Sequence, residues 1–444
     1  MYENLASLLF TFYDNFEHRN VYRNRKFLEK SQWFRKSDIE RLQTRRVKAL
    51  LVHAFENVPF YNESFKRAGF HPSDFRALDD LCKVPVLRKS EVRSNLGELR
   101  ERNVSNGRLK AWFTSGTTAT PIKLFRDQAD VGWGVAAELR GFGWAGYEVG
   151  DKLALIWNVR PNRARSLKFR IGNRLRRCRL LNIGNLSEKS FEAFAADLHR
   201  FQPGFIRGHA GSLNLFASFL LKQRKFSISP KAVFTSCETL LPHYRKTLER
   251  AFGCRVYDYY GSVEVSHVGA QCGCGEGFHV TDENVLVEID RDGEHVSMGE
   301  KGGVLLTNLH GFAMPFIRYD VGDFGRITGH DCCCGRQLSM LEILGRRNEY
   351  FVNRDGSFVF LKDFQRFFNE VPITDFEVAQ LSLDEIVVKI VPKPGFSSQH
   401  SDFILRNLRY VGSGNVRIEL VDSLPPRESG KIAHVVSKVH TDYT

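Results

Sequence analysis

The stretch Phe113-Thr114-Ser115-Gly116-Thr117-Thr118-Ala119-Thr120-Pro121 places five hydroxyl residues and one glycine within nine positions. It follows an apolar lead-in that ends at Trp112 and precedes a basic, apolar run over residues 122–126. Hydroxyl and backbone N–H groups on a flexible loop can turn together toward the oxygens of a triphosphate. The spacing of a Walker loop, GxxxxGK[ST], is absent from the sequence. Because a Ser/Thr-rich turn between two strands explains this stretch equally well, other parts of the chain must decide.

The composition, with 42% hydrophobic and 26% charged residues among 444, is that of a globular chain. The net charge of +13 favours an anionic partner, which could be nucleic acid, a membrane surface, a nucleotide or an acidic carrier protein. Specific nucleic-acid binding is not predicted, because no helix-turn-helix or zinc-finger spacing accompanies the charge. No apolar run reaches the length of about 18 residues that a transmembrane segment needs. The start lacks the basic residues of a secretory signal, and nine cysteines then predict reduced thiols or metal ligands in a cytoplasmic protein.

The spacing of apolar residues changes twice along the chain. Residues 1–110 show helical spacing, and their basic segment Arg19–Lys48 predicts helices over a core or, alternatively, on a membrane surface. From about 110 to 345, short apolar runs alternate with helical segments, which predicts mostly parallel sheets flanked by helices. After Gly345 the pattern becomes that of a smaller α+β unit. We therefore expect an α/β fold with a large domain over residues 1–345 and a small, mobile C-terminal domain over residues 346–444.

Four further stretches contain residues suited to nucleotide chemistry. The stretch Asp258–Glu264 combines aromatic rings that can stack on a base, a glycine that lets a phosphate approach, and a carboxylate that can hold Mg²⁺. The carboxylate of Asp323, at a predicted strand end, can accept both hydroxyl groups of a ribose. Arg346 stands at the predicted domain boundary, and Lys431 lies on a distant glycine loop. Taken singly, each stretch also fits a turn, a surface ion pair or a helix cap.

Together, and in this order, the stretches resemble the adenylate-forming acyl-activating superfamily. The chain is most similar to the branch of phenylacetate–CoA ligases and related capsular-polysaccharide-locus proteins. Two earlier stretches that are typical of that branch, His53–Tyr61 and Val84–Lys89, extend the resemblance over most of the chain.

The resemblance implies a two-step reaction with ATP and Mg²⁺. A carboxylate attacks the α-phosphorus of ATP to give an acyl-adenylate and pyrophosphate, and a second nucleophile then displaces AMP. The catalytic residues that it implies are Lys431, Thr117 and the Mg²⁺ ligand Glu264. The nucleotide-binding residues that it implies are Thr114, Ser115, Gly116, Thr118, Glu238, Asp258, Tyr259, Tyr260, Gly261, Asp323 and Arg346. For Glu238, an acid at a helix N-terminus is the alternative.

The acyl acceptor that the resemblance favours is the thiol of coenzyme A. One alternative is an amine or hydroxyl acceptor in a surface-polysaccharide or secondary-metabolite pathway, and another is a non-catalytic nucleotide-binding scaffold. Nine Lys or Arg residues and no acid lie between Arg160 and Arg179, which predicts either a surface for the 3′-phosphate of coenzyme A or an acidic carrier protein, or an exposed insertion. The identity of the small carboxylic acid and the oligomeric state stay open, with a homodimer among the alternatives.

A second group of residues has the character of a metal site. Cys272 and Cys274 precede His279, and Cys332 and Cys334 follow well downstream. Three cysteines and one histidine on two short loops suit tetrahedral Zn²⁺, and the phenylacetate–CoA-ligase-like branch often carries such a set. Cys332 and Cys334 match its last pair, whereas Cys272 and Cys274 are both candidates for the first cysteine. Four protein ligands would make the ion structural, and a set of free cysteines is the alternative.

Overall fold

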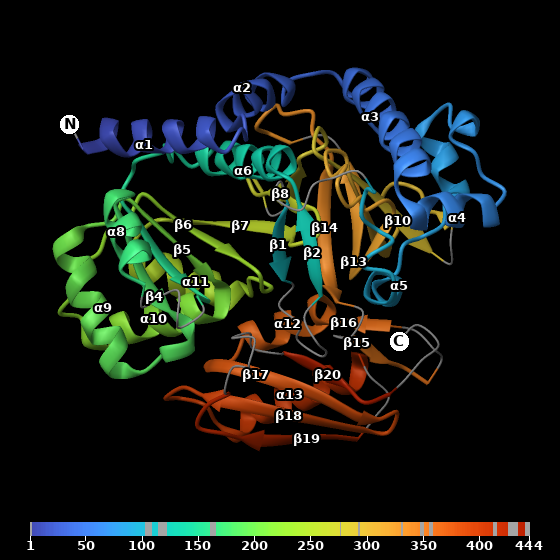
Figure 1. The fold of residues 1–444 in the computed structure, drawn as a ribbon. Helices are drawn as coiled ribbons and strands as arrows, with labels where there is room; N and C mark the ends of the chain where they lie inside the picture. The colour runs from blue at the N-terminus through green and yellow to red at the C-terminus, as the bar shows by residue number, and fades with distance from the viewer. Residues whose placement is uncertain are drawn as a thin grey trace.

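The computed structural model describes residues 2–102, 109–113, 122–159, 166–275, 277–291, 294–329, 332–346, 350–354, 358–411, 415–424 and 434–439. Helices from the first third of the chain lie above and beside a large sheet, and a small α+β unit lies beneath it (Figure 1). None of the helices in these ranges is both long and apolar enough to cross a bilayer.

Residues 1–110 are mostly helical, as the spacing of their apolar residues predicts. The helices are α1 (Tyr2–Phe16), α2 (Val21–Ser31), α3 (Lys36–Asn57), α4 (Pro59–Arg67) and α5 (Lys89–Ser94). In the basic segment Arg19–Lys48, the apolar side chains of Val21, Leu28 and Val47 are fully buried. These helices therefore cover a core, which is the first of the two alternatives for this segment.

The large sheet has twelve strands in the order β11-β10-β12-β13-β14-β9-β8-β7-β6-β5-β3-β4. Its parallel strands are β3 (Leu153–Trp157), β4 (Cys178–Asn182), β5 (Phe205–His209), β6 (Ala232–Ser236) and β7 (Arg255–Ser262). Its remaining strands are β8 (Ser266–Ala270), β9 (Phe278–Val280), β10 (Val285–Arg291), β11 (Glu294–His295), β12 (Gly302–Asn308), β13 (Tyr319–Gly329) and β14 (Met340–Arg346). The first two strands of the chain, β1 (Lys110–Phe113) and β2 (Lys123–Arg126), pair separately as an antiparallel hairpin.

The predicted α/β class is confirmed, and the parallel order is confined to the part of the chain where helices alternate with strands. The helices there are α8 (Leu167–Leu175), α9 (Glu188–Phe201), α10 (Ala210–Gln223) and α11 (Pro242–Phe252). A second face of these strands packs against α6 (Gln128–Gly143) through Phe142, Phe234 and Tyr259. Beyond β7 the connections within this large sheet lack such helices, and its strands β8 to β14 pair antiparallel with their neighbours.

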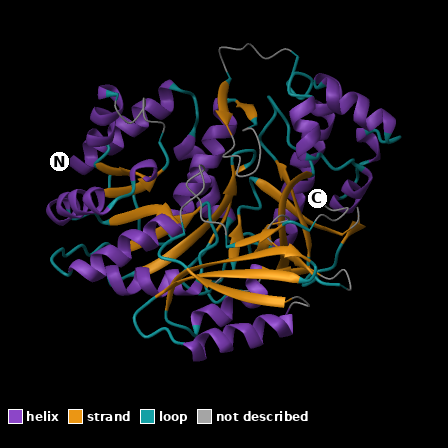
Figure 2. Cartoon of the chain, turned by 90° about the horizontal axis from the view of Figure 1, so that it is seen from below, coloured by secondary structure: helices purple, strands orange, loops and turns teal. Residues whose placement is uncertain are grey.

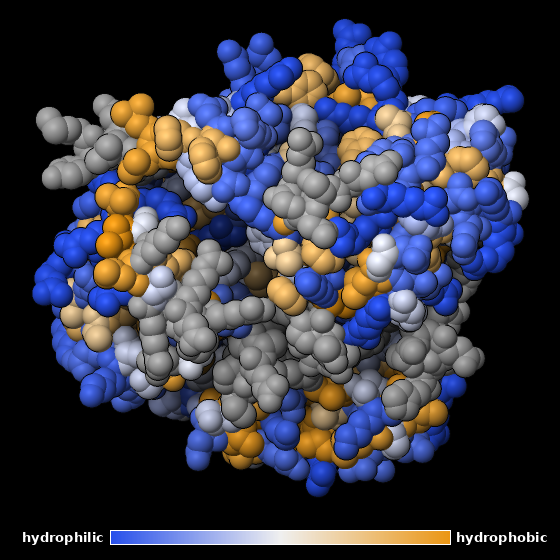
Figure 3. All heavy atoms as spheres, in the orientation of Figure 1, coloured by the Kyte–Doolittle hydropathy of each residue, from blue (hydrophilic) through white to orange (hydrophobic). Residues whose placement is uncertain are grey.

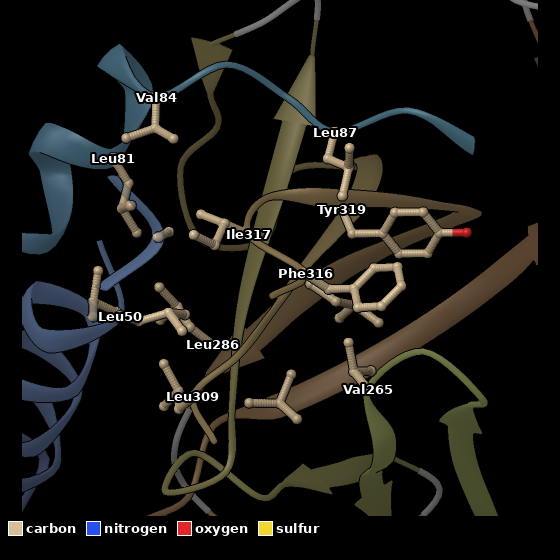
Figure 4. Packing of buried hydrophobic residues seen from close by; sticks show 14 of the residues in the cluster. Leu50, Leu81, Val84, Leu87, Val265, Leu286, Leu309, Phe316, Ile317 and Tyr319 are labelled. Atoms are coloured by element: carbon tan, nitrogen blue, oxygen red, sulfur yellow. The ribbon is translucent and has the colours of Figure 1, made fainter. Parts of the chain in front are cut away.

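One hydrophobic core joins the N-terminal helices to the antiparallel part of the sheet. Figure 4 shows Leu50 of α3 and the side chains of Leu81, Val84 and Leu87 facing residues such as Leu286 of β10 and Ile317, just before β13. Backbone hydrogen bonds extend this contact, because the N–H of Leu87 donates to the carbonyl of Arg318 (3.1 Å) and its carbonyl accepts from the N–H of Asp320 (3.0 Å). The stretch Val84–Lys89 is thereby held beside the start of β13.

The small unit follows β14. It consists of the hairpin β15 (Tyr350–Val352) and β16 (Phe358–Phe360), helices α12 (Leu361–Asn369) and α13 (Ser398–Val411), and strands β17 (Ile373–Ser382), β18 (Glu385–Pro392), β19 (Asn415–Leu420) and β20 (Val435–Ser437). These last four strands form a sheet in the order β19-β18-β17-β20, which lies across the underside of the molecule (Figure 2). The domain boundary near residue 346 stays a prediction, and it falls at the end of β14.

Candidate functional site

The carboxylate of Asp323 on β13 is held from two sides by residues of two other strands. The hydroxyl of Tyr260 on β7 donates to its Oδ2 (2.6 Å), and Nε of Arg346 on β14 donates to its Oδ1 (3.0 Å). Arg346 is also the direct partner of Asp323 in the β13–β14 ladder. Burial, and then the neighbouring carboxylate, raise the pKa of Tyr260 well above its ordinary value, so the phenol keeps the proton that it donates. Three residues that are far apart in the sequence thus form one hydrogen-bonded group.

Glu264 lies in the turn between β7 and β8, beside the same group. Its Oε1 accepts a hydrogen bond from the hydroxyl of Tyr319 at the start of β13 (2.8 Å). The side chain of Glu264 is buried, and burial together with Glu264 raises the pKa of Tyr319. One carboxylate oxygen is therefore oriented by a neutral donor, an arrangement that suits a ligand of Mg²⁺.

A lysine that was not among the predicted site residues also belongs to this region. Lys89 is the first residue of α5, two positions after the backbone contact of Leu87 with β13. Burial lowers the pKa of Lys89, and the charges of Glu264, Arg346 and Asp323 act on its ammonium group. The signal in the sequence was present, since Lys89 ends the stretch Val84–Lys89 that carries part of the family resemblance. Its role was not apparent, because only the fold brings that stretch to β13.

Asp258 and Tyr259 are neighbours on β7 with different surroundings. Oδ1 of Asp258 accepts from the hydroxyl of Thr235 on β6 (2.7 Å), and burial raises the pKa of Asp258 to about 7. The ring of Tyr259 packs instead in the buried aromatic cluster under α6, with centroids 4.7 Å from Phe142 and 5.6 Å from Phe234. Successive side chains of a strand point to opposite faces, so Tyr259 faces away from Tyr260. Its packing favours a role in the core over the predicted contact with adenine.

Glu238 follows β6 and contacts the next helix. Its Oε2 accepts from the backbone N–H of Gly211 in the first turn of α10 (2.7 Å). This contact is that of an acid at a helix N-terminus, which is the alternative to nucleotide binding for this residue. The preceding Cys237 has a φ of 71°, a left-handed conformation that non-glycine residues rarely adopt outside turns and functional loops.

Two predicted parts of the site lie outside the described residues. These are Lys431 and the hydroxyl-rich loop with Thr114, Ser115, Gly116, Thr117 and Thr118. The strands on either side of that loop are described, and they pair so that Phe113 lies opposite Lys123.

The small unit contacts the large one through a buried polar cluster next to Lys431 in the sequence. The hydroxyl of Tyr244 on α11 donates to Oδ2 of Asp375 on β17 (2.9 Å) and lies 3.3 Å from Nε2 of His434. Nδ1 of His434 is in turn 3.4 Å from Oδ1 of Asp375. Apolar residues of both units surround the cluster, including Leu241 from the large unit and Phe376 from the small one. His434 stands three positions after Lys431, so this contact anchors the chain close to the lysine.

Four side chains that can bind a metal ion converge beside β9. The ligand atoms of Cys272, His279, Cys332 and Cys334 all lie within 4.8 Å of one another. Nε2 of His279 is 3.3 Å from Sγ of both Cys272 and Cys334, and the Sγ atoms of Cys272 and Cys332 are 3.6 Å apart. A tetrahedral zinc ion would separate sulfur from sulfur by about 3.8 Å and sulfur from nitrogen by about 3.5 Å. These three distances are close to those of a tetrahedral zinc site, so the chemistry and placement of the four residues fit zinc.

The fourth predicted cysteine, Cys274, is placed differently. It is joined to Cys333 by a disulfide bond, so the expectation of reduced thiols does not hold for this pair. Of the two candidates that the sequence left open for the first ligand, Cys272 thus lies with His279, whereas Cys274 is bonded elsewhere. Residues 272–274 and 332–334 run side by side. Cys272 therefore lies next to Cys332, and Cys274 is bonded to Cys333.

Comparison with known proteins identifies the relatives of this chain. It is 29% identical over 328 residues to the phenylacetate-coenzyme A ligase of Escherichia coli, covering 71% of this chain and 73% of that protein. It is 20% identical over 425 residues to Protein CapK of Staphylococcus aureus, covering 91% and 90%. Residues 351–438 match the CapK C-terminal domain. The chain is thus similar to phenylacetate-coenzyme A ligases over about 70% of its length and to Protein CapK over 91% of it.

Solved structures of CoA ligases share the fold of this chain. The 2-hydroxyisobutyryl-CoA ligase in the postadenylation state, in complex with 2-HIB-AMP, superposes with a TM-score of 0.77 at 20% identity, over 92% of each chain. The same ligase in the thioesterification state gives a TM-score of 0.62 at 20% identity, over 92% of this chain and 91% of that one. Identity and coverage are nearly equal in the two comparisons, and the postadenylation structure superposes better on this chain.

The raised pKa of Asp258 predicts a pH-dependent effect of Asp258→Asn. An aspartate in an unfolded chain titrates near a pKa of about 3.9, so the folded protein holds this proton more tightly and the wild type loses stability as pH rises from about 4 to about 7. Asparagine cannot ionise. The variant should therefore gain free energy of unfolding relative to the wild type, from near zero at about pH 4 to a few kcal/mol at about pH 8. Denaturant unfolding at both pH values measures the difference in free energy of unfolding between the variant and the wild type. A difference that is equal at the two pH values would contradict the prediction.

Proposed function

We propose that this protein is an ATP-dependent ligase that adenylates a carboxylic acid and transfers the acyl group to the thiol of coenzyme A. The observation that carries the proposal is the group around Asp323, in which Tyr260 and Arg346 orient one carboxylate beside a second, Glu264. The fold of adenylate-forming ligases and the similarity to phenylacetate-coenzyme A ligases support the same conclusion.

In the first half-reaction, Asp323 would hold the ribose of ATP. Each of its oxygens accepts one protein hydrogen bond and keeps a second lone pair for a ribose hydroxyl. Glu264, oriented by Tyr319, would bind Mg²⁺, which neutralises charge on the phosphates when it is bound. Lys89 and Arg346 add positive charge at the same place. Lys431 would neutralise the charge that develops between the attacking carboxylate and the α-phosphate.

The second half-reaction is the attack of an acceptor on the acyl-adenylate. The similarity to phenylacetate-coenzyme A ligases favours coenzyme A as the acceptor. A specific observation favours an alternative, since residues 351–438 match the CapK C-terminal domain and the similarity to Protein CapK extends over 91% of this chain. An amine or hydroxyl acceptor in surface-polysaccharide synthesis is therefore the second candidate. Both candidates share the adenylation step.

Adenylation is tested by acid-dependent exchange of labelled pyrophosphate into ATP, across a panel of aryl, arylacetic, short-chain and hydroxy acids. We expect exchange with one class of acid, and a loss of at least about 10²-fold in Lys431→Ala, which removes a positive charge from the transition state, and in Glu264→Gln, which removes an anionic ligand of Mg²⁺. Release of thioester, amide or ester then identifies the acceptor. Exchange that persists undiminished in both variants would contradict the assigned roles, and no exchange with any acid would favour a nucleotide-binding scaffold.

The contact of Tyr244, Asp375 and His434 would hold the small unit in the arrangement that serves adenylation. The higher TM-score with a postadenylation structure than with a thioesterification structure supports this assignment. Lys431 is covalently close to His434, so the position of the lysine would depend on the same contact. Acyl transfer, which uses a different arrangement in the related ligase, would not need it.

Tyr244→Phe should therefore affect the two half-reactions unequally. Loss of the hydroxyl should slow pyrophosphate exchange by about tenfold, because Lys431 would be held in its reactive position less often. Acyl transfer from supplied acyl-adenylate should stay near the wild-type rate. Tyr61→Phe is a matched control, since Tyr61 is equally buried and its hydroxyl donates to the carbonyl of Pro315 within the large unit (2.9 Å). That control should lower stability without separating the half-reactions. Equal slowing of both steps by Tyr244→Phe would contradict the proposal.

We further propose that Cys272, His279, Cys332 and Cys334 hold a structural zinc ion. Nearby contacts indicate what the ion would stabilise, because Gln32 at the end of α2 accepts hydrogen bonds from Arg336 and from Trp144, both at 2.9 Å. The ring of Trp144 also packs edge-on against His279. A zinc ion here would tie the loop of residues 332–337 and β9 to α2 and the end of α6.

Purified protein should contain about one zinc ion per chain. Cys272→Ser and Cys334→Ser should each lose the metal and lower the melting temperature by at least about 5 °C, because metal-binding free energy contributes to folding. Metal analysis and thermal unfolding, with and without a chelator, measure both effects. Cys82→Ser, at an exposed free cysteine far from this cluster in sequence, should change neither. Metal-free protein whose melting temperature is indifferent to Cys272→Ser would contradict the site.

A further inference from the structure

Helix α1 exposes a continuous apolar face although its other side is packed. The exposed fractions are 72% for Phe12, 71% for Phe16 and 64% for Leu8, and Leu9 and Tyr13 extend the same face. Positions 8, 9, 12, 13 and 16 share one side of a helix. The opposite side is anchored to α2, since Asp14 is buried and accepts from the N–H of Val21 (2.9 Å), and the ring of Phe10 packs edge-on against Tyr22.

Helix α8 exposes a second apolar face, and this one is flanked by positive charge. Leu167, Ile171 and Leu175 recur every four residues with exposed fractions of 68%, 50% and 49%. Arg170 and Arg174 are exposed next to them on the same helix. No Asp or Glu occurs from Ser166 to Ser187, so no acid in this segment offsets the arginines. Helix α8 connects β3 to its parallel neighbour β4, and the alternatives for the basic run Arg160–Arg179 stay predictions, since residues 160–165 lie outside the described ranges.

These two helices concentrate the exposed apolar side chains of the molecule. Of fifteen large apolar side chains that are exposed in the described part of the chain, eight lie on α1 and α8. Figure 3 shows apolar residues gathered at the upper left of the molecule, where Figure 1 places α1 above α8. Elsewhere the exposed apolar residues are dispersed over several elements, as on most globular surfaces. We name the exposed faces of these two helices the α1–α8 surface.

We propose that the α1–α8 surface docks the protein onto an anionic lipid bilayer. Leucine, isoleucine and phenylalanine side chains would enter the boundary between headgroups and acyl chains, and Arg170 and Arg174 would contact lipid phosphates. Charge selects this occupant. If α8 packed against α8 of a second copy of the chain, the same arginines would meet across the symmetric interface, which like-charge repulsion opposes. An anionic bilayer instead offers acyl chains to the apolar face and phosphates to the arginines.

This inference goes beyond the proposed ligase activity and does not depend on it. The docking helices belong to the outer side of the large unit, whereas the group around Asp323 lies where β7, β13 and β14 meet. In Figure 1, α1 and α8 are on the far side of the molecule from β13. The protein would thus bind the bilayer without presenting the site of adenylation to it.

Co-sedimentation of the full-length protein with lipid vesicles tests the proposal. We expect binding to vesicles of phosphatidylcholine with phosphatidylglycerol, weaker binding to phosphatidylcholine alone, and a decrease with added salt. Leu167→Gln with Ile171→Gln should weaken binding by at least about tenfold, and Arg170→Glu with Arg174→Glu should do the same. Since all four residues are on the surface, thermal unfolding and pyrophosphate exchange should stay at wild-type values.

Matched controls alter equally exposed residues elsewhere. Met298→Gln with Leu420→Gln removes apolar side chains that are 56% and 58% exposed, and Arg67→Glu with Arg76→Glu reverses two exposed charges. Both pairs should bind vesicles as the wild type does. The proposal is overturned if the wild type binds no vesicle, or if the α8 pairs bind as well as the controls. It is also overturned if the apolar pair abolishes self-association of the protein while vesicle binding is absent, because the surface would then join two copies of the chain.

Discussion

The hydrogen-bonded group centred on the carboxylate of Asp323 is the point on which the candidate site depends. A buried carboxylate is stable only when donors satisfy it, and here a phenol and a guanidinium do so from two different strands. The group therefore forms only when the end of β7, which is not a neighbour of β13 in the sheet, lies close to the paired strands β13 and β14. The same arrangement places Tyr319 against Glu264, so both acidic residues of the site are oriented by tyrosines whose burial keeps them protonated.

The change of strand direction at β7 explains why this site can be assembled. The parallel strands end at one edge, where ligands of α/β proteins usually bind. The antiparallel strands that follow β7 return the chain to this edge, which brings Asp323 and Arg346 beside Tyr260. The turn between β7 and β8 contributes Glu264, and the short contact of Leu87 with β13 contributes Lys89. Parallel and antiparallel halves of one sheet thus supply different groups to the same site.

The molecule separates its tasks by location. The group around Asp323 lies inside the large unit, and the polar cluster of Tyr244, Asp375 and His434 joins this unit to the small one. The cluster of cysteines and His279 lies where the N-terminal helices meet the sheet. The α1–α8 surface is on the outer side. A rearrangement of the small unit during a reaction cycle would therefore disturb neither the cysteine cluster nor the outer surface.

The sequence by itself determined the α/β class, the helical first part, and the residues whose chemistry suits a nucleotide, because these depend on local periodicity and on residue type. Thus Asp323, Tyr260, Glu264 and Arg346 were identified from their motifs, and the zinc candidates from their spacing. Only the tertiary structure decided which of them meet. It placed Tyr259 in the core, bonded Cys274 to Cys333, and brought Lys89 and His434 to positions that no motif indicated. The physical reason is that strand pairing and burial are long-range, so the face to which a side chain points is set by neighbours that lie far away in the sequence.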